Sequence, residues 1–395
     1  ELSWQEDETA NLLSNKLENF GFDVSRGVGK KGVVAIYENG KGPVLMIRAD
    51  MDALPVEEKT NLPYSSKVRS INRSGVEVPV MHACGHDIHM AVLIGSASEL
   101  IERKNEWTGT LIMILQPAEE VGQGSLAMLE DGLFERFPRP DFNLALHVGS
   151  SGPAGSVGYH LGYSMANVDS VDIIVKGVGG HGAYPHTTVD PIVLSSQIVL
   201  ALQTIVSREI NPLEPAVVTV GSIHGGLKHN IIPDEVRLQL TLRSYSDDVR
   251  KKTINNIKRI VKGQALAAGL SADKMPTVIL KDEHTPALYN DPDFSNRVLN
   301  FIRNEIGSEN VHEIPAVMGG EDFGRFGRQE PRIPSFLFWL GGTSEEDWKR
   351  YQKGEIVLAS NHSPFFAPIP QPTLSTGIRA MTSSAIGLLQ IKEIN

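Results

Sequence analysis

Three apolar, strand-like stretches in the first 150 residues each end in residues that can bind a metal ion. The stretches are residues 44–50, 108–116 and 142–148, and the residues at their ends are, in order, Asp50 with Asp52, Glu119 with Glu120, and His147, where we expect the third strand to stop. Near-continuous apolar runs are typical of buried parallel strands. Because α/β sheets bind ligands beyond the carboxyl ends of their strands, the pattern predicts an α/β fold with one ligand site.

The only cysteine of the chain, Cys84, lies two residues before His86, where we expect a helix to begin between the first two strands. A thiolate and an imidazole at this spacing can reach one ion, and both are preferred ligands of zinc and similar divalent metals. Taken alone, the pair could also be a buried free cysteine with a histidine neighbour. The metal-binding residues elsewhere in the chain favour the metal site.

A chain of 395 residues is too long for one ordinary core and suggests two or three compact units. The pattern changes near residue 165 to strand, helix, two strands, helix and strand. We therefore predict a mixed-sheet α/β/α catalytic domain made of residues 1–164 and 281–395. An α+β domain of βαββαβ order, residues 165–280, would be inserted into it.

Charge and hydropathy exclude several classes of partner. The formal net charge of -10 argues against a nucleic-acid-binding surface. We find no apolar run that approaches the roughly 20 residues of a membrane helix, so we expect a soluble protein without membrane association. We expect it in the cytoplasm, and an exported form stays open because the chain begins at Glu1 rather than at a methionine.

Six side chains form the expected metal site: Cys84, His86, Glu119, Glu120, His147 and His362. A structural zinc site needs four ligands and usually pairs closely spaced cysteines, which this chain lacks. Six groups instead suit two ions that share a ligand, an arrangement that polarises a carbonyl and lowers the pKa of water.

Two pairs of adjacent or nearly adjacent acids have different expected roles. Neighbouring side chains on an extended backbone point in opposite directions, so one of Glu119 and Glu120 can bind metal while the other faces the attacking water. For Asp50 and Asp52, orienting an imidazole is as well supported as direct ligation.

Eight motifs, in order along almost the whole chain, are RADMDALPVEE, MHACGHD, LQPAEE, ALHVG, GGHGAYPH, HNIIPD, MGGEDF and NHSPFF. Together they resemble the dinuclear-metal aminoacylase and carboxypeptidase family. The resemblance is greatest to the branch that contains hippurate hydrolases and hydrolases of auxin–amino-acid conjugates.

This resemblance implies a role for each residue of the expected metal site. Cys84 matches the bridging ligand, Glu119 the general base and Asp52 an acid that supports the site. The other ligands would be His86, Glu120, His147 and His362. Asp50 stands where the wider family has a histidine, and the thiolate enters at Cys84 instead. A thiolate favours zinc, while similar family members often use manganese, so we expect two divalent ions, zinc or manganese.

The inserted domain resembles the lid and dimerisation domain of the family, which implies a homodimer. His181 and Asn230 match residues that stabilise the oxyanion, with the histidine often supplied by the partner subunit, and Arg243 matches a residue that binds the substrate carboxylate. From the residues alone we would assign a turn histidine, a turn-forming asparagine and a solvated strand end. The remaining histidines, among them His89, we expect to be structural or on the surface.

The expected activity is metal-dependent hydrolysis of the amide bond of small N-acyl amino acids. A dipeptidase or carboxypeptidase would use the same two ions and the same base. A protein that binds acyl-amino acids without turnover is a further alternative, which the presence of both Glu119 and Glu120 disfavours. A purely structural zinc protein fits least well.

Overall fold

The computed structural model describes residues 1–282 and 284–390, and the chain forms two compact units. The first unit consists of residues 1–164, 289–316 and the chain from Asp322 onward. The second unit consists of Met165–Leu288 and Val317–Glu321. It therefore extends past residue 280, where the sequence pattern of the insert ends, and takes in a second short segment.

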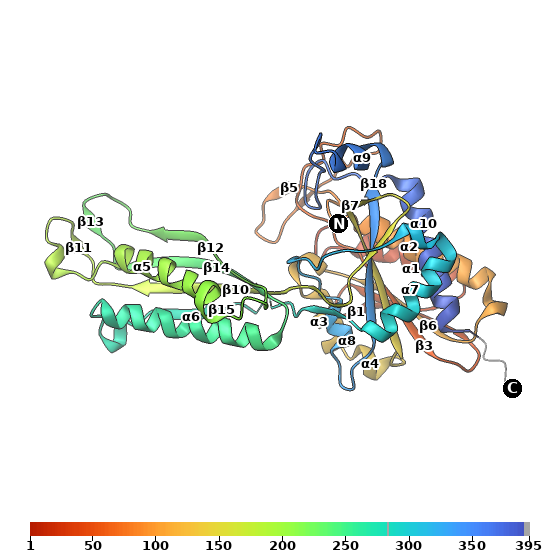
Figure 1. Ribbon diagram of the computed structural model, residues 1–395, viewed down its shortest axis with the longest axis horizontal. Coiled ribbons are helices and arrows are strands. Elements are labelled where there is room, and N and C mark those ends of the chain that lie inside the picture. Colours follow the sequence, from red (N-terminus) through yellow and green to blue (C-terminus); the bar gives the residue numbers. More distant parts are fainter. Residues whose placement is uncertain (283, 391–395) are drawn as a thin grey trace. The chain divides into compact units, whose positions relative to one another are not determined.

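An eight-stranded sheet forms the centre of the first unit (Figure 1). In spatial order its strands are β1 (Asp23–Val28), β2 (Gly32–Asn39), β6 (Gly109–Gln116), β3 (Val44–Asp50), β7 (Phe142–Pro153), β18 (Ser335–Thr343), β8 (Val157–Tyr159) and β17 (Val311–Glu313). The four central strands are parallel, whereas β1 and β2 pair antiparallel with each other and β2 with β6. The predicted mixed-sheet α/β fold is confirmed.

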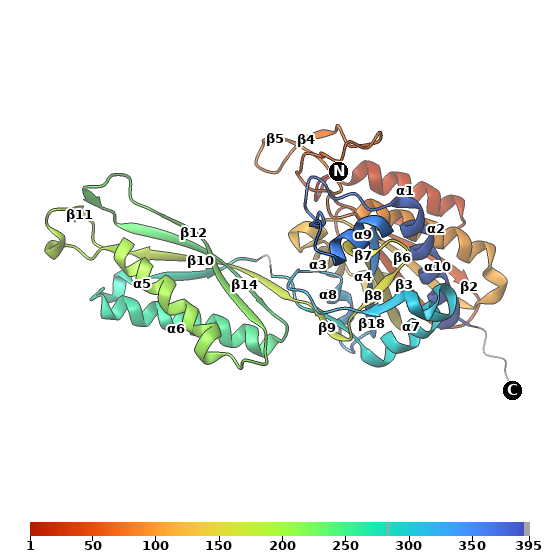
Figure 2. The ribbon, with the colours of Figure 1, turned by 45° about the horizontal axis from the view of Figure 1, so that its top comes forward.

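Helices cover both faces of this sheet (Figures 1 and 2). One face carries α1 (Asp7–Asn19), α2 (His86–Glu102), α7 (Pro292–Ile306) and α10 (Pro370–Leu388), and the other carries α3 (Gly124–Glu130), α4 (Leu133–Arg136) and α8 (Gly324–Gly327). A further helix, α9, spans Glu345–Gln352, and a small hairpin pairs β4 (Arg69–Ile71) with β5 (Glu77–Pro79). The amphipathic pattern from Thr373 to Ile391 predicts the last helix, α10, and Ile391 lies outside the described residues.

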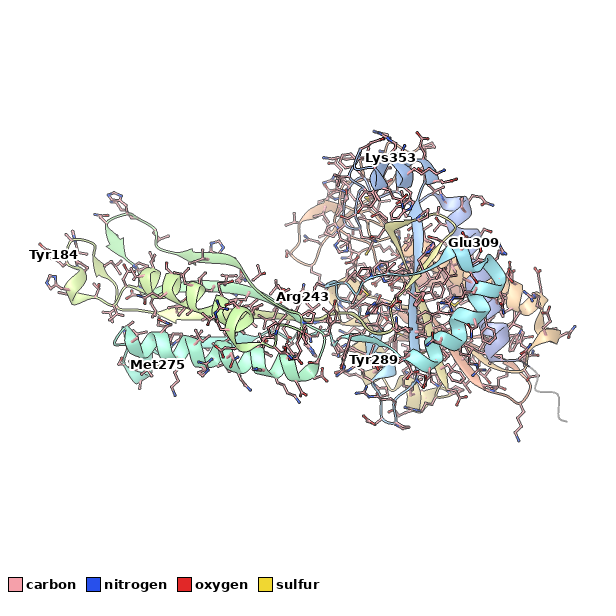
Figure 3. All side chains as sticks on the ribbon, in the orientation of Figure 1. Tyr184, Arg243, Met275, Tyr289, Glu309 and Lys353 are labelled. Atoms are coloured by element: carbon pink, nitrogen blue, oxygen red, sulfur yellow. The ribbon has the colours of Figure 1, made fainter. Side chains whose placement is uncertain are left out.

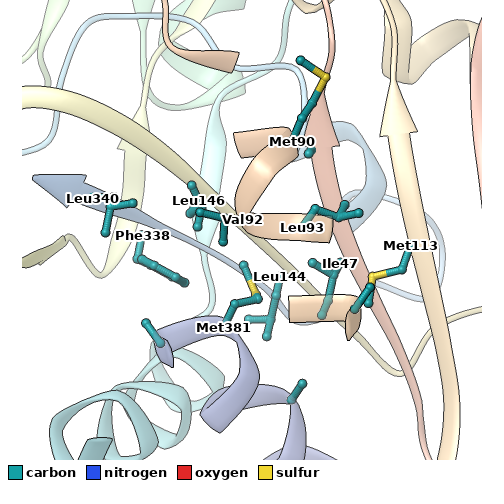
Figure 4. Close-up of a cluster of buried hydrophobic side chains, with 14 of the residues drawn as sticks. Ile47, Met90, Val92, Leu93, Met113, Leu144, Leu146, Phe338, Leu340 and Met381 are labelled. Carbon is teal, nitrogen blue, oxygen red and sulfur yellow. The ribbon is translucent and has the colours of Figure 1, made fainter. Parts of the chain in front are cut away.

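The main core lies between the sheet and the first group of helices. Met113 on β6 and Leu144 on β7 pack with Leu93 on α2 and Met381 on α10 (Figure 4). Successive strand residues alternate between the faces, so the apolar run of β6 can serve both layers of helices. Burial on both faces explains why the sequence of this strand shows a continuous apolar run.

The register of the central strands places the predicted site residues side by side at the same edge of the sheet. Asp50 pairs with Gln116 on β6, and Arg48 pairs with Ala145 on β7, which puts His147 beside Asp50. The prediction that the third strand stops at His147 is wrong, since β7 continues to Pro153. Its backbone goes on pairing with β18 although residues 149–153 lack the apolar side chains that the prediction used.

The second unit contains a four-stranded antiparallel sheet with two helices. Its elements in chain order are β10 (Asn167–Lys176), α5 (Pro191–Thr204), β12 (Ala216–Gly225), β14 (Glu235–Ser244), α6 (Asp247–Ala267) and β15 (Thr277–Leu280), with a separate pair of two-residue strands, β11 (Gly180–His181) and β13 (Ile231–Ile232). This is the predicted βαββαβ order. On β14, Leu238 and Leu240 are buried in the core with α5 and α6, while Gln239 between them is exposed.

One helical stretch, Pro191–Glu209, is long and apolar enough to cross a membrane. Its Ile198 and Leu202 are buried in the core of the second unit. Length and apolar composition alone do not make it a membrane span, because the core helix of a globular domain meets the same criteria.

Candidate metal centre

The predicted metal site lies where β3, β6 and β7 end or pass and where α2 begins. Gly85, between Cys84 and His86, has φ of +84°, and a Cβ placed on it would lie 2.3 Å from a methyl carbon of Val148 on β7. Both the left-handed backbone and the close approach require glycine here. This glycine therefore lets the thiol and the imidazole lie directly against β7.

Two groups of possible metal ligands share Cys84. One consists of Cys84, His86 and His147, and the other of Cys84, Glu120 and His362; within each group the ligand atoms lie within 4.8 Å of one another. Glu119 forms a further group with His86 and Glu120. The structure therefore brings all six predicted residues together, in a geometry that suits two ions with one shared ligand.

Backbone carbonyls orient two of the imidazoles. Nδ1 of His86 lies 2.7 Å from the carbonyl oxygen of Asp52, and Nδ1 of His147 lies 2.8 Å from that of Val148. Because a carbonyl oxygen only accepts, each Nδ1 donates, and in the neutral imidazole each Nε2 keeps the lone pair that a metal ion needs.

At this site, two buried polar atoms of the described residues have no hydrogen-bond partner. They are Nε2 of His86 and Oε1 of Glu120, which lie 3.8 Å apart. Buried polar atoms normally have partners, and a divalent ion would satisfy both atoms at once. These residues therefore fit a bound metal.

The Cys84 side chain is held in the form that binds metals. Burial alone, the largest single effect, would raise the pKa of its thiol, and the charge of His147, whose Nε2 lies 3.5 Å from the sulfur, opposes burial. Together with hydrogen bonding this charge holds the pKa of Cys84 well below the usual value. The thiolate is the form of cysteine that ligates metals.

Asp52 holds the turn that carries the two glutamates. Its Oδ1 accepts the backbone N–H of Glu119 at 3.1 Å, and its Oδ2 accepts that of Glu120 at 3.0 Å. Ser3 donates its hydroxyl to the same Oδ2 at 2.6 Å. The carboxylate of Asp52 is thus engaged with backbone and hydroxyl donors, as expected for a supporting acid.

Asp50 and His89 form a buried pair beside the metal-binding residues. Nδ1 of His89 lies 2.6 Å from Asp50, and its Nε2 accepts the backbone N–H of Val148 at 2.8 Å. Arg48 donates to the other oxygen of Asp50 at 2.6 Å. Both ring nitrogens of His89 have hydrogen-bond partners, as a histidine with a structural role requires.

His362 reaches the site from the far end of the chain. It has φ of +70°, and its backbone N–H donates to the carbonyl oxygen of Ala83 at 2.7 Å. Its Nε2 lies 3.4 Å from Oε2 of Glu120, and hydrogen bonds to Cys84 and Glu120 raise the pKa of His362 to about 10. The bond to Ala83 fixes this loop beside Cys84.

Sequence reasoning missed Asn361 and Glu6. The amide of Asn361 donates to the carbonyl oxygens of Cys84 at 3.1 Å and Val148 at 3.0 Å, tying the loop of His362 to both. Its place next to His362 in the NHSPFF motif was a usable signal. Glu6 accepts the backbone N–H of Ala118 at 2.8 Å, a contact across the chain that no local pattern indicates.

The three residues predicted in the insert lie in the second unit. His181 and Asn230 are exposed neighbours, since Gly182 donates its N–H to the carbonyl oxygen of Asn230 at 2.9 Å. Ile231, which pairs with His181, precedes the first residue of β14, whereas Arg243 is next to its last residue. Figure 3 shows Arg243 and Tyr184, a neighbour of His181, at opposite ends of this unit. This unit therefore keeps two of its predicted residues together and the third apart.

Two groups of possible ligands that share one thiol, beside the ends of β3 and β6, are the arrangement expected of a dinuclear metal hydrolase. A family profile described as "Peptidase family M20/M25/M40" matches residues 46–356. The chain belongs to this family, whose members hydrolyse amide bonds with bound metal.

Relatives and solved structures agree with this assignment. Thermostable carboxypeptidase 1 of Saccharolobus solfataricus is 36% identical over 390 residues, which cover 98% of this chain and 91% of the relative. Hippurate hydrolase of Campylobacter jejuni is 38% identical over 341 residues, 85% of this chain and 84% of the relative. The crystal structure of the Bacillus subtilis YxeP protein, a dinuclear metal-binding peptidase, matches with a TM-score of 0.75 and 30% identity over 98% of this chain and 94% of that one.

Proposed function

We propose that the chain hydrolyses the amide bond of N-acyl amino acids, with Glu119 as general base. The observation that carries this proposal is the pair of ligand groups that share Cys84, next to a second carboxylate on the same turn. His86 and His147 would complete one metal position with Cys84. Glu120 and His362 would complete the other. Three relatives, hippurate hydrolase and two deacetylases of N-acetylcysteine, act on substrates of this class by their names.

Glu119 transfers protons in the proposed reaction. The chemistry that two divalent ions supply when bound is polarisation of the scissile carbonyl and a lowered pKa for the attacking water. Glu119 accepts a proton from that water as its oxygen bonds to the carbonyl carbon. It then gives the proton to the amine nitrogen as the C–N bond breaks, which releases a carboxylate and a free amino acid. Asp52 keeps Glu119 in place through the backbone.

The second unit would supply the groups that bind the substrate. Nδ1 of His181 accepts the N–H of Ala183 at 3.0 Å, so Nε2 carries the hydrogen and is a donor for an oxyanion, a task that Asn230 would share. Arg243 hydrogen-bonds to the carbonyl oxygen of Leu242 at 2.9 Å and would bind the substrate carboxylate.

The length of β14 supports a homodimer. The eight residue steps between Glu235 and Arg243 span about 26 Å at roughly 3.3 Å per residue, and His181 pairs with Ile231 beyond the Glu235 end. One copy of this unit cannot place His181 and Arg243 on the same small substrate. His181 and Asn230 would therefore serve the site of a partner subunit, while Arg243 serves its own.

An exposed apolar surface on the second unit supports the same proposal. On α5, Val193 is 54% exposed and Leu200 is 73% exposed, and β12 is an edge strand of the sheet with Ile223 51% exposed. Exposed apolar patches and unpaired strand edges are typical of association surfaces. Leu200→Glu should convert a dimer to monomers in analytical ultracentrifugation, whereas Lys258→Glu, a charge change on α6, should not. A monomeric parent chain would contradict the homodimer.

The identity of the metal is part of the same proposal. The Cys84 thiolate favours zinc, and the carboxylate and imidazole ligands also suit manganese. Protein reconstituted separately with each ion should bind two ions per chain, measured by inductively coupled plasma mass spectrometry. The ion that gives the higher kcat is then assigned as the catalytic metal.

A substrate panel tests the proposed reaction. N-acetyl amino acids, N-benzoyl amino acids and dipeptides are offered to each metal-loaded form, and the free amino acid is measured. We expect release from N-acyl amino acids that stops when the metal is chelated. Faster cleavage of peptides would favour the carboxypeptidase alternative. Two relatives named as carboxypeptidases support this alternative. Binding without product release would show a protein that captures acyl-amino acids.

A further inference from the structure

The turn that carries Glu119 and Glu120 is held by three consecutive backbone N–H groups. Asp52 accepts those of Glu119 and Glu120, and Glu6 accepts that of Ala118 through Oε1 at 2.8 Å. Ala118 has φ of +51°, in the left-handed region that residues with a Cβ avoid. Because its backbone conformation is unfavourable, this peptide needs an external contact to hold it.

The side chain of Glu6 accepts the N–H of Ala118 instead of capping its own helix, α1. Glu6 is the N-cap residue of α1, yet its side chain accepts no hydrogen bond from that helix. The same Oε1 accepts the N–H of Trp4 at 2.9 Å, and Ser3, nearby in the chain, binds Asp52. Residues 3–6 therefore supply two side chains to the support of the glutamate turn.

Burial makes the presence of an acid at this position costly. Glu6 is 0% exposed, and its Oε2 is buried without a hydrogen-bond partner within residues 1–282 and 284–390. Burial and the nearby charge of Asp52 raise the pKa of Glu6 to about 7. A buried polar atom without a partner lowers stability, so an apolar side chain would serve packing better. The carboxyl group therefore points to a role in the function of the turn.

We propose that Glu6 is a positioning residue for amide hydrolysis, which holds the Ala118 peptide so that Glu119 is aimed at the attacking water. This inference rests on the proposed function of Glu119. Glu6 touches neither the proposed ligands nor the reacting atoms, and it acts through the backbone between Ala118 and Glu120.

Kinetics of Glu6→Ala and Glu6→Gln test this role. Alanine removes the acceptor, and we expect kcat to fall at least tenfold with KM and the two bound ions little changed. Glutamine keeps an acceptor oxygen and should restore most of the lost kcat. The matched control is Ser14→Ala, because Ser14 is also buried on α1 and is not near the turn in sequence or in its hydrogen bonds. An alanine variant with the parent kcat would overturn the inference.

Hydrogen exchange of the metal-free protein gives a readout that needs no turnover. In Glu6→Ala, the fragment covering residues 117–124 should exchange at least tenfold faster than in the parent protein, and Glu6→Gln should not show this acceleration. Unchanged exchange in Glu6→Ala overturns the inference even if the parent protein is active. If the parent cleaves no acyl-amino acid while exchange changes as expected, the proposed function fails and the support of the turn by Glu6 stands.

Discussion

The residues proposed to bind metal and those proposed to bind substrate are held in different ways. In the first unit, His86 and Asp52 are buried, and each is fixed by hydrogen bonds to backbone groups. In the second unit, His181 and Asn230 are exposed on short strands and turns. The residues proposed to bind metal thus all lie in one unit, and those proposed to bind substrate all lie in the other.

The largest effect should follow from removing the shared ligand. Cys84→Ala takes one ligand from both metal positions, so bound metal should fall from two ions to one or fewer and hydrolysis should disappear. Plasma mass spectrometry gives the metal content. Ser96→Ala, a buried polar change on the α2 helix that follows Cys84, is the control and should retain both ions. Two ions in the Cys84 variant would remove this residue from the site.

Glu119→Gln should separate chemistry from metal binding in the first unit. Loss of a general base costs about 10²- to 10⁴-fold in rate, and we expect kcat to fall in this range while two ions stay bound. Steady-state kinetics and metal analysis of the same preparation check both parts. A variant that keeps the parent kcat would show that another group takes the proton.

The buried acid Glu6 should make the stability of the first unit depend on pH. Its folded pKa is about 7 against an ordinary value of 4.5, so the folded state binds more protons between these values and stability falls as pH rises through them. At about 1.4 kcal/mol per pKa unit, Glu6→Gln should gain about 3 kcal/mol relative to the parent between pH 4.5 and pH 8. Chemical denaturation of metal-free protein at both pH values measures this gain. If the free energies of unfolding of Glu6→Gln and the parent differed by the same amount at both pH values, the raised pKa of Glu6 would be contradicted.

Arg243→Ala should have a smaller effect and should act on binding. A hydrogen bond to a charged group contributes about 1.5–3 kcal/mol, so KM should rise about 10- to 100-fold while metal content stays the same. Arg237→Ala is a matched control on the same strand, where Arg237 pairs with Asp172. Equal changes of KM in both variants would mean that the second unit recognises the substrate through overall charge.

Sequence patterns predicted the candidate site residues of the first unit but not those of the second, for a physical reason. Apolar runs that end in Asp50, Glu119 and His147 follow from the burial of parallel strands, and parallel register brings their ends together. The length of β7 was missed because residues 149–153 pair through the backbone without apolar side chains. His181, Asn230 and Arg243 were predicted only from family resemblance, since neither an exposed turn nor the end of an alternating strand indicates substrate binding by its pattern. The contact of Glu6 with Ala118 joins distant residues that no local pattern connects.

The hydrogen bond from His362 to Ala83 has a consequence for the synthesis of this protein. His362 lies near the end of the chain, while the other proposed ligands lie within its first 150 residues. A nascent chain on the ribosome can fold its early strands, but the second metal position must wait for the closing segment. A product that ends before His362 would therefore lack one of the proposed ligands and could not complete the second proposed metal position.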